Sequence, residues 1–181
     1  MATVLQVSDY LAFLSQTDGE PEPLSPKKLQ KLLYYAQGLS VAKTGQPLFP
    51  EKIEAWLGGP VVPIVWREYK ECGCSGIVNR LKDAGLSLDE RVFLRQVWRL
   101  YGKFTGAELS VMTHREAPWQ AARQGLPQDA KNRKEIPLES LAEFFSKQNI
   151  ELPAVPRPVA IRKGREVYRI EDAGKLLPAG I

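Results

Sequence analysis

The chain has 181 residues, of which 44% are hydrophobic and 25% are charged. This suits one globular domain and disfavours a mainly disordered or repetitive protein. The net charge of +4 is too small to require a nucleic-acid partner by itself. One histidine and two cysteines cannot form a four-ligand zinc site without carboxylates, so composition disfavours an enzyme.

The sequence shows no sign of membrane insertion or secretion. It contains no run of about 18 apolar residues, so no transmembrane helix is expected. The first twenty residues lack a basic region and place Asp9 inside their apolar stretch, which argues against a signal peptide. Cys72 and Cys74 are too close together for a favourable disulfide, so we expect free thiols in a reducing cytoplasm. A metal or redox role for the pair stays open.

Two helices are predicted before residue 46. Residues 4–14 carry apolar side chains at helical spacing. The second helix begins after Ser25, a favourable N-cap followed by Pro26, and ends before Gly45.

One face of the second helix is predicted to be buried. Lys27, Lys28 and Lys31 are expected to lie largely off that face. Consecutive positions on a helix are about 100° apart, so Tyr34 and Tyr35 should not both enter one core. The predicted apolar face comprises Leu29, Leu32, Leu33, Ala36, Leu39 and Ser40.

Residues 45–86 are predicted to be less regular. Residues 53–57 can form only a short strand or one turn of helix, and Gly58-Gly59-Pro60 imposes a tight bend. Pro63 can open a new helix that carries Trp66. The Gly-rich stretch 71–86 leaves room for a short strand at 76–79.

Two capping boxes mark further helices. Ser87 with Glu90 and Thr105 with Glu108 each have the spacing at which two side chains satisfy two free backbone N–H groups. Shorter helices are expected from Pro118 and over residues 137–148. In the helix after Ser87, the side chains expected to face the core are Val92, Phe93, Val97, Leu100, Tyr101 and Phe104.

The character of the chain changes at residue 151. Three prolines are followed by alternating apolar residues around Lys163-Gly164, a pattern that predicts a hairpin over 159–170. We therefore divide the chain into a body, 1–150, and a basic Pro-rich extension, 151–181. The predicted fold is mainly α (α or α+β): a compact bundle of about six short helices with a small β element and a C-terminal hairpin-like extension.

Few residues are candidates for chemistry. His114 near Glu116 is the only material for a hydrolase, and no G-x-S-x-G motif accompanies it. We favour a structural position for His114 at a helix C-terminus. No catalytic, cofactor-binding or metal-binding residue is predicted, and no cofactor is expected.

Two binding functions can be considered. Arg91, Arg95 and Arg99 recur at four-residue steps, which would align them along one helix side. This stripe, or the basic extension after residue 150, could serve a DNA-binding regulator. A solvated charged face explains the same pattern more simply. Exposed tryptophans would instead indicate a protein interface, and Trp56 and Trp119 are the first candidates.

Several linked motifs resemble one family. Between about residues 9 and 148 the chain is similar to the Panacea domain family, which covers SocA-like antitoxins and phage-associated GepA-like proteins. Gly59 stands where that family often has His or Arg. The motifs are KLQKLLYYAQG at 28–38, GQPLF at 45–49, EAWLGGPVVP at 54–63, and the pattern LSxxTHxxxPW at 109–119.

The resemblance implies an antitoxin that neutralises a co-encoded toxin protein by direct binding, with a role in prophages or phage defence. It also implies that some members hand their toxin to an ATP-dependent protease. A DNA-binding regulator of its own operon is the alternative, membrane binding is not expected, and the oligomeric state is left open. The predicted partner-binding residues are Tyr34, Trp56, Trp66, His114, Arg115, Trp119, Arg162, Arg165 and Tyr168.

Overall fold

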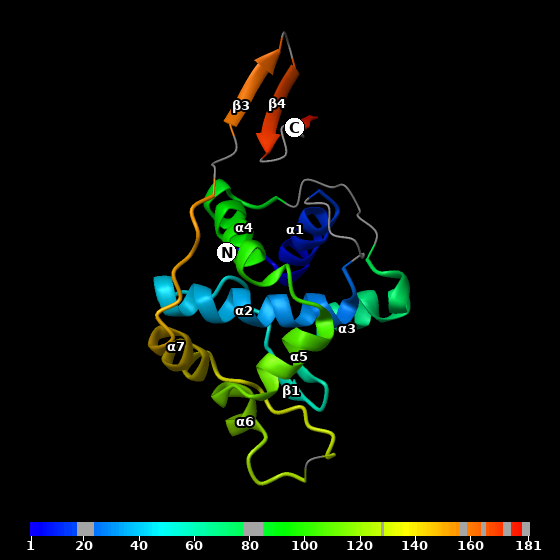
Figure 1. Cartoon of the computed structure of the whole chain (residues 1–181), viewed down its shortest axis with the longest axis vertical. Coiled ribbons are helices and arrows are strands. Elements are labelled where there is room, and N and C mark those ends of the chain that lie inside the picture. Colours follow the sequence, from blue (N-terminus) through cyan, green and yellow to red (C-terminus); the bar gives the residue numbers. More distant parts are fainter. Residues whose placement is uncertain are drawn as a thin grey trace.

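A computed structural model describes residues 1–17, 24–77, 85–127, 129–155, 159–163, 166–171 and 175–178. Over these ranges the fold is mainly α, as predicted, with seven α-helices rather than about six (Figure 1). The helices are α1 (Val4–Thr17), α2 (Pro26–Thr44), α3 (Pro63–Tyr69), α4 (Leu88–Tyr101), α5 (Gly106–His114), α6 (Ala117–Ala122) and α7 (Leu138–Lys147), with a 3-10 helix η1 (Lys70–Ser75). The strands are β1 (Glu54–Trp56), β2 (Gly59–Val61), β3 (Val159–Lys163), β4 (Glu166–Glu171) and β5 (Lys175–Pro178).

Helix α2 forms the centre of the fold. Its predicted ends are confirmed: the Ser25 side chain accepts a hydrogen bond from the Lys28 N–H, and Gly45 closes the helix with φ at +71°. Helices α1, α4, α5 and α7 all pack against α2. Figure 1 shows α1 and α4 on one side of α2 and α5 and α7 on the other.

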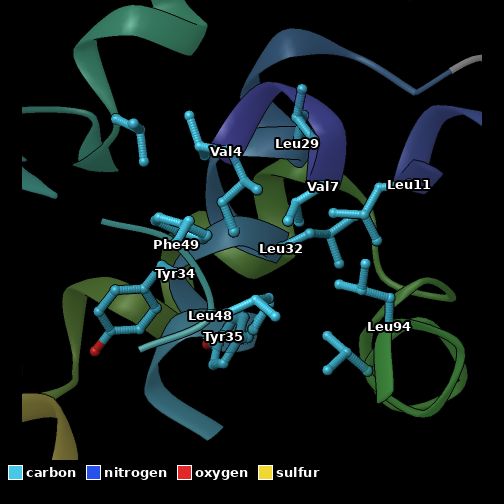
Figure 2. Close-up of a cluster of buried hydrophobic side chains, with 14 of the residues drawn as sticks. Val4, Val7, Leu11, Leu29, Leu32, Tyr34, Tyr35, Leu48, Phe49 and Leu94 are labelled. Carbon is cyan, nitrogen blue, oxygen red and sulfur yellow. The ribbon is translucent and has the colours of Figure 1, made fainter. Parts of the chain in front are cut away.

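Because α2 is surrounded, it has no solvent-facing side along most of its length. Every residue from Leu29 to Val41 is buried. Tyr34 and Tyr35 are therefore both buried, and the prediction that one of them reaches the surface is wrong. Lys31 is also buried, contrary to its predicted position off the core face. Figure 2 shows Tyr34 and Tyr35 close to Leu48 and Phe49 of the following segment.

Helices α4 and α5 begin as predicted, since both capping boxes are formed. The buried face of α4 differs from the prediction: Leu94 and Trp98 are buried, whereas Val92, Phe93 and Leu100 are only half-buried. Val97 and Tyr101 are buried, so the prediction is confirmed for these two residues.

The predicted exposed arginine stripe on α4 is wrong. Arg91 and Arg95 are buried, and only Arg99 is exposed. The Arg91 Nε donates to the Leu86 carbonyl at 3.0 Å, and the Arg95 Nε donates to the Tyr10 hydroxyl at 3.0 Å. The arginine stripe, one of the two regions proposed for DNA binding, is therefore largely buried, whereas a role for the basic extension stays a prediction.

Strands β1 and β2 form a short antiparallel hairpin, with Ala55 opposite Pro60. The predicted strand, the bend at Gly58-Gly59 and the helix opened by Pro63 are thus confirmed. On the outer side of β1, the Ala55 N–H donates to the Lys134 carbonyl at 2.9 Å and the Ile136 N–H donates to the Ile53 carbonyl at 2.8 Å.

The stretch predicted to be irregular contains η1, and the Ile77 N–H donates to the Leu24 carbonyl. A strand was predicted over 76–79, but residues 76 and 77 lie in none, and 78 and 79 fall outside the described residues. Cys72 is a free thiol, and the side chain of Cys74 lies outside the described part of the chain.

The C-terminal segment first runs along α4. The Gln96 side chain donates to the Pro153 carbonyl at 2.9 Å, and Arg99 donates to the Ala154 carbonyl at 3.1 Å. The predicted hairpin is confirmed, with Val159 opposite Ile170, and Figure 1 shows β3 and β4 apart from the helices. A third strand, β5, pairs with β4 and was not predicted. The division of the chain at residue 150 stays a prediction.

Candidate functional site

Polar side chains of α2 hold the segment that follows it. The Gln37 Oε1 accepts hydrogen bonds from the Leu48 N–H at 2.9 Å and the Phe49 N–H at 3.3 Å. The Gln37 Nε2 donates to the Phe49 carbonyl at 2.9 Å. A buried amide side chain thus satisfies three backbone groups of an irregular segment, which would otherwise be costly to bury.

The same helix closes the outer edge of β2. The Val62 N–H donates to the Gln30 Oε1 at 2.7 Å, and the Gln30 Nε2 donates back to the Val62 carbonyl at 3.3 Å. The Lys31 Nζ donates to the Pro60 carbonyl at 2.9 Å. These side chains occupy backbone groups that a neighbouring strand would otherwise use.

Lys31, Gly59 and His114 meet next to the turn of the hairpin. Gly59 has φ at +106°, and a Cβ atom there would lie 2.6 Å from the Lys31 Nζ and 3.3 Å from the His114 Nε2. Only glycine allows this backbone conformation and this approach together. Burial, reinforced by the Lys27 charge, lowers the pKa of Lys31 to about 7.

His114 is the last residue of α5, as predicted, and its ring stacks on Trp119 with a centroid distance of 4.3 Å. Burial lowers the pKa of His114, and the charges of Lys31, Lys27 and Arg123 lower it further. The imidazole is therefore neutral near pH 7. It acts here as a flat packing surface for Trp119.

A buried tyrosine–glutamate cluster adjoins His114. The Tyr35 hydroxyl donates to the Glu116 Oε1 at 2.8 Å, and the Tyr35 ring stacks on Tyr101 at 4.0 Å. Burial raises the pKa of Glu116, although the neighbouring tyrosine hydroxyls oppose this. Burial and the Glu116 charge in turn raise the pKa of Tyr34 and of Tyr35.

Three atoms of this region are buried and make no hydrogen bond within the described part of the chain: the Tyr34 hydroxyl, the His114 Nε2 and the Glu116 Oε2. The residues that the structure describes include no group of three or more His, Cys, Asp or Glu side chains placed to hold a metal ion. In the same described ranges, none of the helices is both long and apolar enough to cross a membrane.

Three tryptophans lie on or beside the hairpin. The Trp119 Nε1 donates to the Trp56 carbonyl at 3.0 Å, and the rings of Trp56 and Trp66 lie 5.5 Å apart. Arg123 lies over the Trp119 ring at 5.2 Å and donates to the Ala55 carbonyl at 3.2 Å. Trp66 has 39% of its surface exposed, whereas Trp56 and Trp119 are half-buried.

The structure brings together four of the predicted partner-binding residues, Trp56, Trp66, His114 and Trp119, with Arg115 exposed beside His114. Tyr34 lies apart from any surface, because its side chain is fully buried.

The remaining three predicted residues belong to the C-terminal segment. Arg162 lies in β3 opposite Val167, and Tyr168 lies in β4 opposite Ile161. Arg165 falls outside the described residues. A role for these three residues in partner binding stays a prediction.

Sequence reasoning missed Gln30, Lys31 and Gln37. The sequence did carry a signal, because apolar residues occur on every side of α2 around these polar positions, which is typical of a helix buried all round. It also missed the exposed apolar residues Leu57 and Val111 beside the hairpin.

Comparison with known proteins gives a consistent result. Residues 29–120, from α2 to α6, match the family described as "Antitoxin SocA-like, Panacea domain". The chain is also 33% identical over 116 residues to Antitoxin SocA of Caulobacter vibrioides (strain NA1000 / CB15N), across 57% of this chain and 62% of that protein. It thus spans about three fifths of the length of this curated relative. No solved structure matches the chain.

Proposed function

Because the chain belongs to the Panacea domain family of SocA-like antitoxins, we propose that it is an antitoxin that neutralises a protein toxin by binding it directly. The observation that carries this proposal is the extent of the family match. Residues 29–120 include all of α2 except its first three residues, the β1–β2 hairpin and the surrounding aromatic side chains.

The physical character of the hairpin region supports binding rather than catalysis. Trp56, Trp66 and Trp119 are partly exposed and are fixed by hydrogen bonds and ring contacts to one another or to the backbone. Rigid aromatic side chains of this kind concentrate binding energy at protein interfaces. His114 is neutral and stacked on Trp119, which suits a structural position.

Growth rescue and complex formation test the proposal together. The protein is expressed with the toxic protein encoded beside its gene, each under a separate inducible promoter, in a bacterial host. We expect the toxin alone to stop growth, and the pair to grow and to yield a stable complex through a tag on either chain. If the pair shows no growth rescue and forms no complex, the proposal is refuted.

We propose that the protein acts in the cytoplasm. Neutralisation there could occur by blocking the toxin or by delivering it to a protease, and the two mechanisms differ in the lifetime of the toxin. If the complex blocks the toxin, the toxin should persist in the rescued cells after translation is stopped. If this protein hands the toxin to an ATP-dependent protease, the half-life of the toxin should shorten when both are present. That shortening should disappear in a host that lacks the protease.

A further inference from the structure

Exposed apolar side chains lie on the β1–β2 hairpin and on the neighbouring helices α3 and α5. Leu57 is 45% exposed, Trp66 is 39% exposed and Val111 is 51% exposed, and Trp56 is half-buried beside Trp66. The Ser110 hydroxyl donates to the Gly58 carbonyl at 3.1 Å, which holds α5 against the turn. We call these four residues, Trp56, Leu57, Trp66 and Val111, the hairpin surface.

The backbone of the hairpin is already fully engaged along both edges. The outer edge of β1 pairs with Lys134 and Ile136, and the outer edge of β2 is covered by Gln30 and Lys31 of α2. A partner therefore cannot bind here by adding a strand, which requires free N–H and C=O groups on an edge. It has to bind through side-chain contacts.

The rim of the hairpin surface is basic. Lys70 lies over the Trp66 ring at 5.3 Å, and Arg133 lies over the Trp56 ring at 5.9 Å. Arg67 on α3 and Arg115 at the end of α5 are exposed.

The acidic residues nearby are largely occupied. The Glu54 carboxylate accepts a hydrogen bond from the Trp56 Nε1 at 2.6 Å, and Glu71 pairs with Lys70 at 3.4 Å. Within the described part of the chain, Arg67, Arg115 and Arg133 form no salt bridge. The complementary surface would therefore carry carboxylates around an apolar centre.

We propose that the hairpin surface is the docking site for the toxin, and that it takes an acidic segment of the toxin whose apolar or aromatic side chain packs on Trp66 and Leu57. This rests on the proposed antitoxin function. A second copy of this chain is a poorer occupant, since two basic rims would face each other. Exposed tryptophan at the centre and arginine at the rim also match the residue types that dominate binding energy at interfaces.

The test measures binding of the full chain to the toxin encoded beside its gene, immobilised on a biosensor. Trp66→Ala should weaken binding about 30-fold or more, as expected for a central tryptophan. Leu138→Ala, which removes a 37% exposed side chain at the start of α7, is the matched control and should change binding less than about twofold. Thermal melting of each variant confirms that it is folded.

A charge-reversal pair tests the acidic character of the partner. Arg67→Glu combined with Arg133→Glu should slow association about tenfold at 50 mM salt, and the effect should largely vanish at 500 mM salt. Lys43→Glu, at the far end of α2, is the control for added negative charge.

The outcomes separate the two proposals. If the unaltered protein fails to bind the toxin, the antitoxin function fails and this inference fails with it. If the unaltered protein binds and the folded Trp66→Ala variant binds equally well, the docking site is wrong while the function stands. Loss of a homodimer on Trp66→Ala substitution, seen by sedimentation, would identify a second copy as the occupant and overturn the inference. Binding that does not depend on salt would overturn the proposal that the docked segment of the toxin is acidic.

Discussion

Replacing Lys31 by methionine should remove a rise in stability that accompanies increasing pH. Lys31 is only 1% exposed, and its Nζ has the Pro60 carbonyl as acceptor at 2.9 Å. Burial and the Lys27 charge lower its pKa from 10.5 to about 7. The folded protein therefore disfavours the charged ammonium that water stabilises in the unfolded chain.

The size of the effect follows from proton linkage. Below pH 7 both states hold the proton, so the cost of burying the charge is fully present. Between pH 7 and pH 10.5 the unfolded chain binds more protons than the folded one, so the free energy of unfolding rises with pH. At about 1.36 kcal/mol per pKa unit, and with Lys31 half-titrated at pH 7, the gain from pH 7 to pH 9 is about 2 kcal/mol.

The assay is urea unfolding of the wild type and Lys31→Met at several pH values from 7 to 9. The difference in unfolding free energy between the two proteins should grow by about 2 kcal/mol over this range in favour of the wild type. His114 contributes little, because its lowered pKa places its titration below this window. Lys43→Met, at an exposed position of the same helix, should show no such trend.

A difference that stays constant from pH 7 to pH 9 would refute the reasoning. It would mean that Lys31 keeps its proton in the folded protein throughout this range. The buried ammonium would then have more stabilising partners than the Pro60 carbonyl.

Three further predictions concern the packing of the body. Gly38→Ala should destabilise the protein by about 1–3 kcal/mol in urea unfolding, because a Cβ there would lie 2.2 Å from the Phe145 ring. An unchanged unfolding midpoint would contradict this and show that α7 shifts to accommodate the methyl group. Gln37→Leu should cost about 3 kcal/mol or more, since three buried backbone groups lose their partner, and a loss below 1 kcal/mol would contradict this. Removal of residues 156–181 should leave the melting temperature nearly unchanged and weaken toxin binding, whereas unfolding of the body would show that these residues are part of its core.

Matched controls separate these effects from general ones. The cost of Gly38→Ala should shrink when Phe145→Leu is introduced with it, because the clash is between these two positions. Gln148→Leu alters an exposed glutamine and should cost little. Truncation after Gln148 should destabilise the body, because it also removes Ile150 and Leu152, which pack against the core.

The ends of the elements could be predicted from the sequence because they depend on local chemistry. Ser25 and Gly45 bound α2, and Ser87 and Thr105 start α4 and α5, through hydrogen bonds to residues at most four positions away. The start of α3 at Pro63 is also local, because the fixed φ of proline suits the first position of a helix.

What faces inward could not be predicted in the same way, because it depends on distant parts of the chain. Tyr34 and Tyr35 are both buried because Phe145 of α7 contacts both rings and Tyr101 of α4 stacks on Tyr35. Arg95 is buried because the Tyr10 hydroxyl of α1 accepts its hydrogen bond.

Some residues of the candidate site were singled out from the sequence, but their arrangement was not. Trp56, His114 and Trp119 were singled out separately, and only the fold shows that Trp119 contacts both the backbone of Trp56 and the ring of His114. Leu57 and Val111 gave no signal, since a single exposed apolar residue is common in any sequence.

The glutamines of α2 also affect how the protein opens. The amides of Leu48, Phe49 and Val62 lie outside helices and sheets or at their margins, where hydrogen exchange is ordinarily fast. Each donates to Gln37 or Gln30, which are buried on the central helix. Their exchange then requires separation from α2, so these loop amides should exchange as slowly as the helix itself. We therefore expect the irregular segment to detach from α2 only in openings that also break its hydrogen bonds to Gln30 and Gln37.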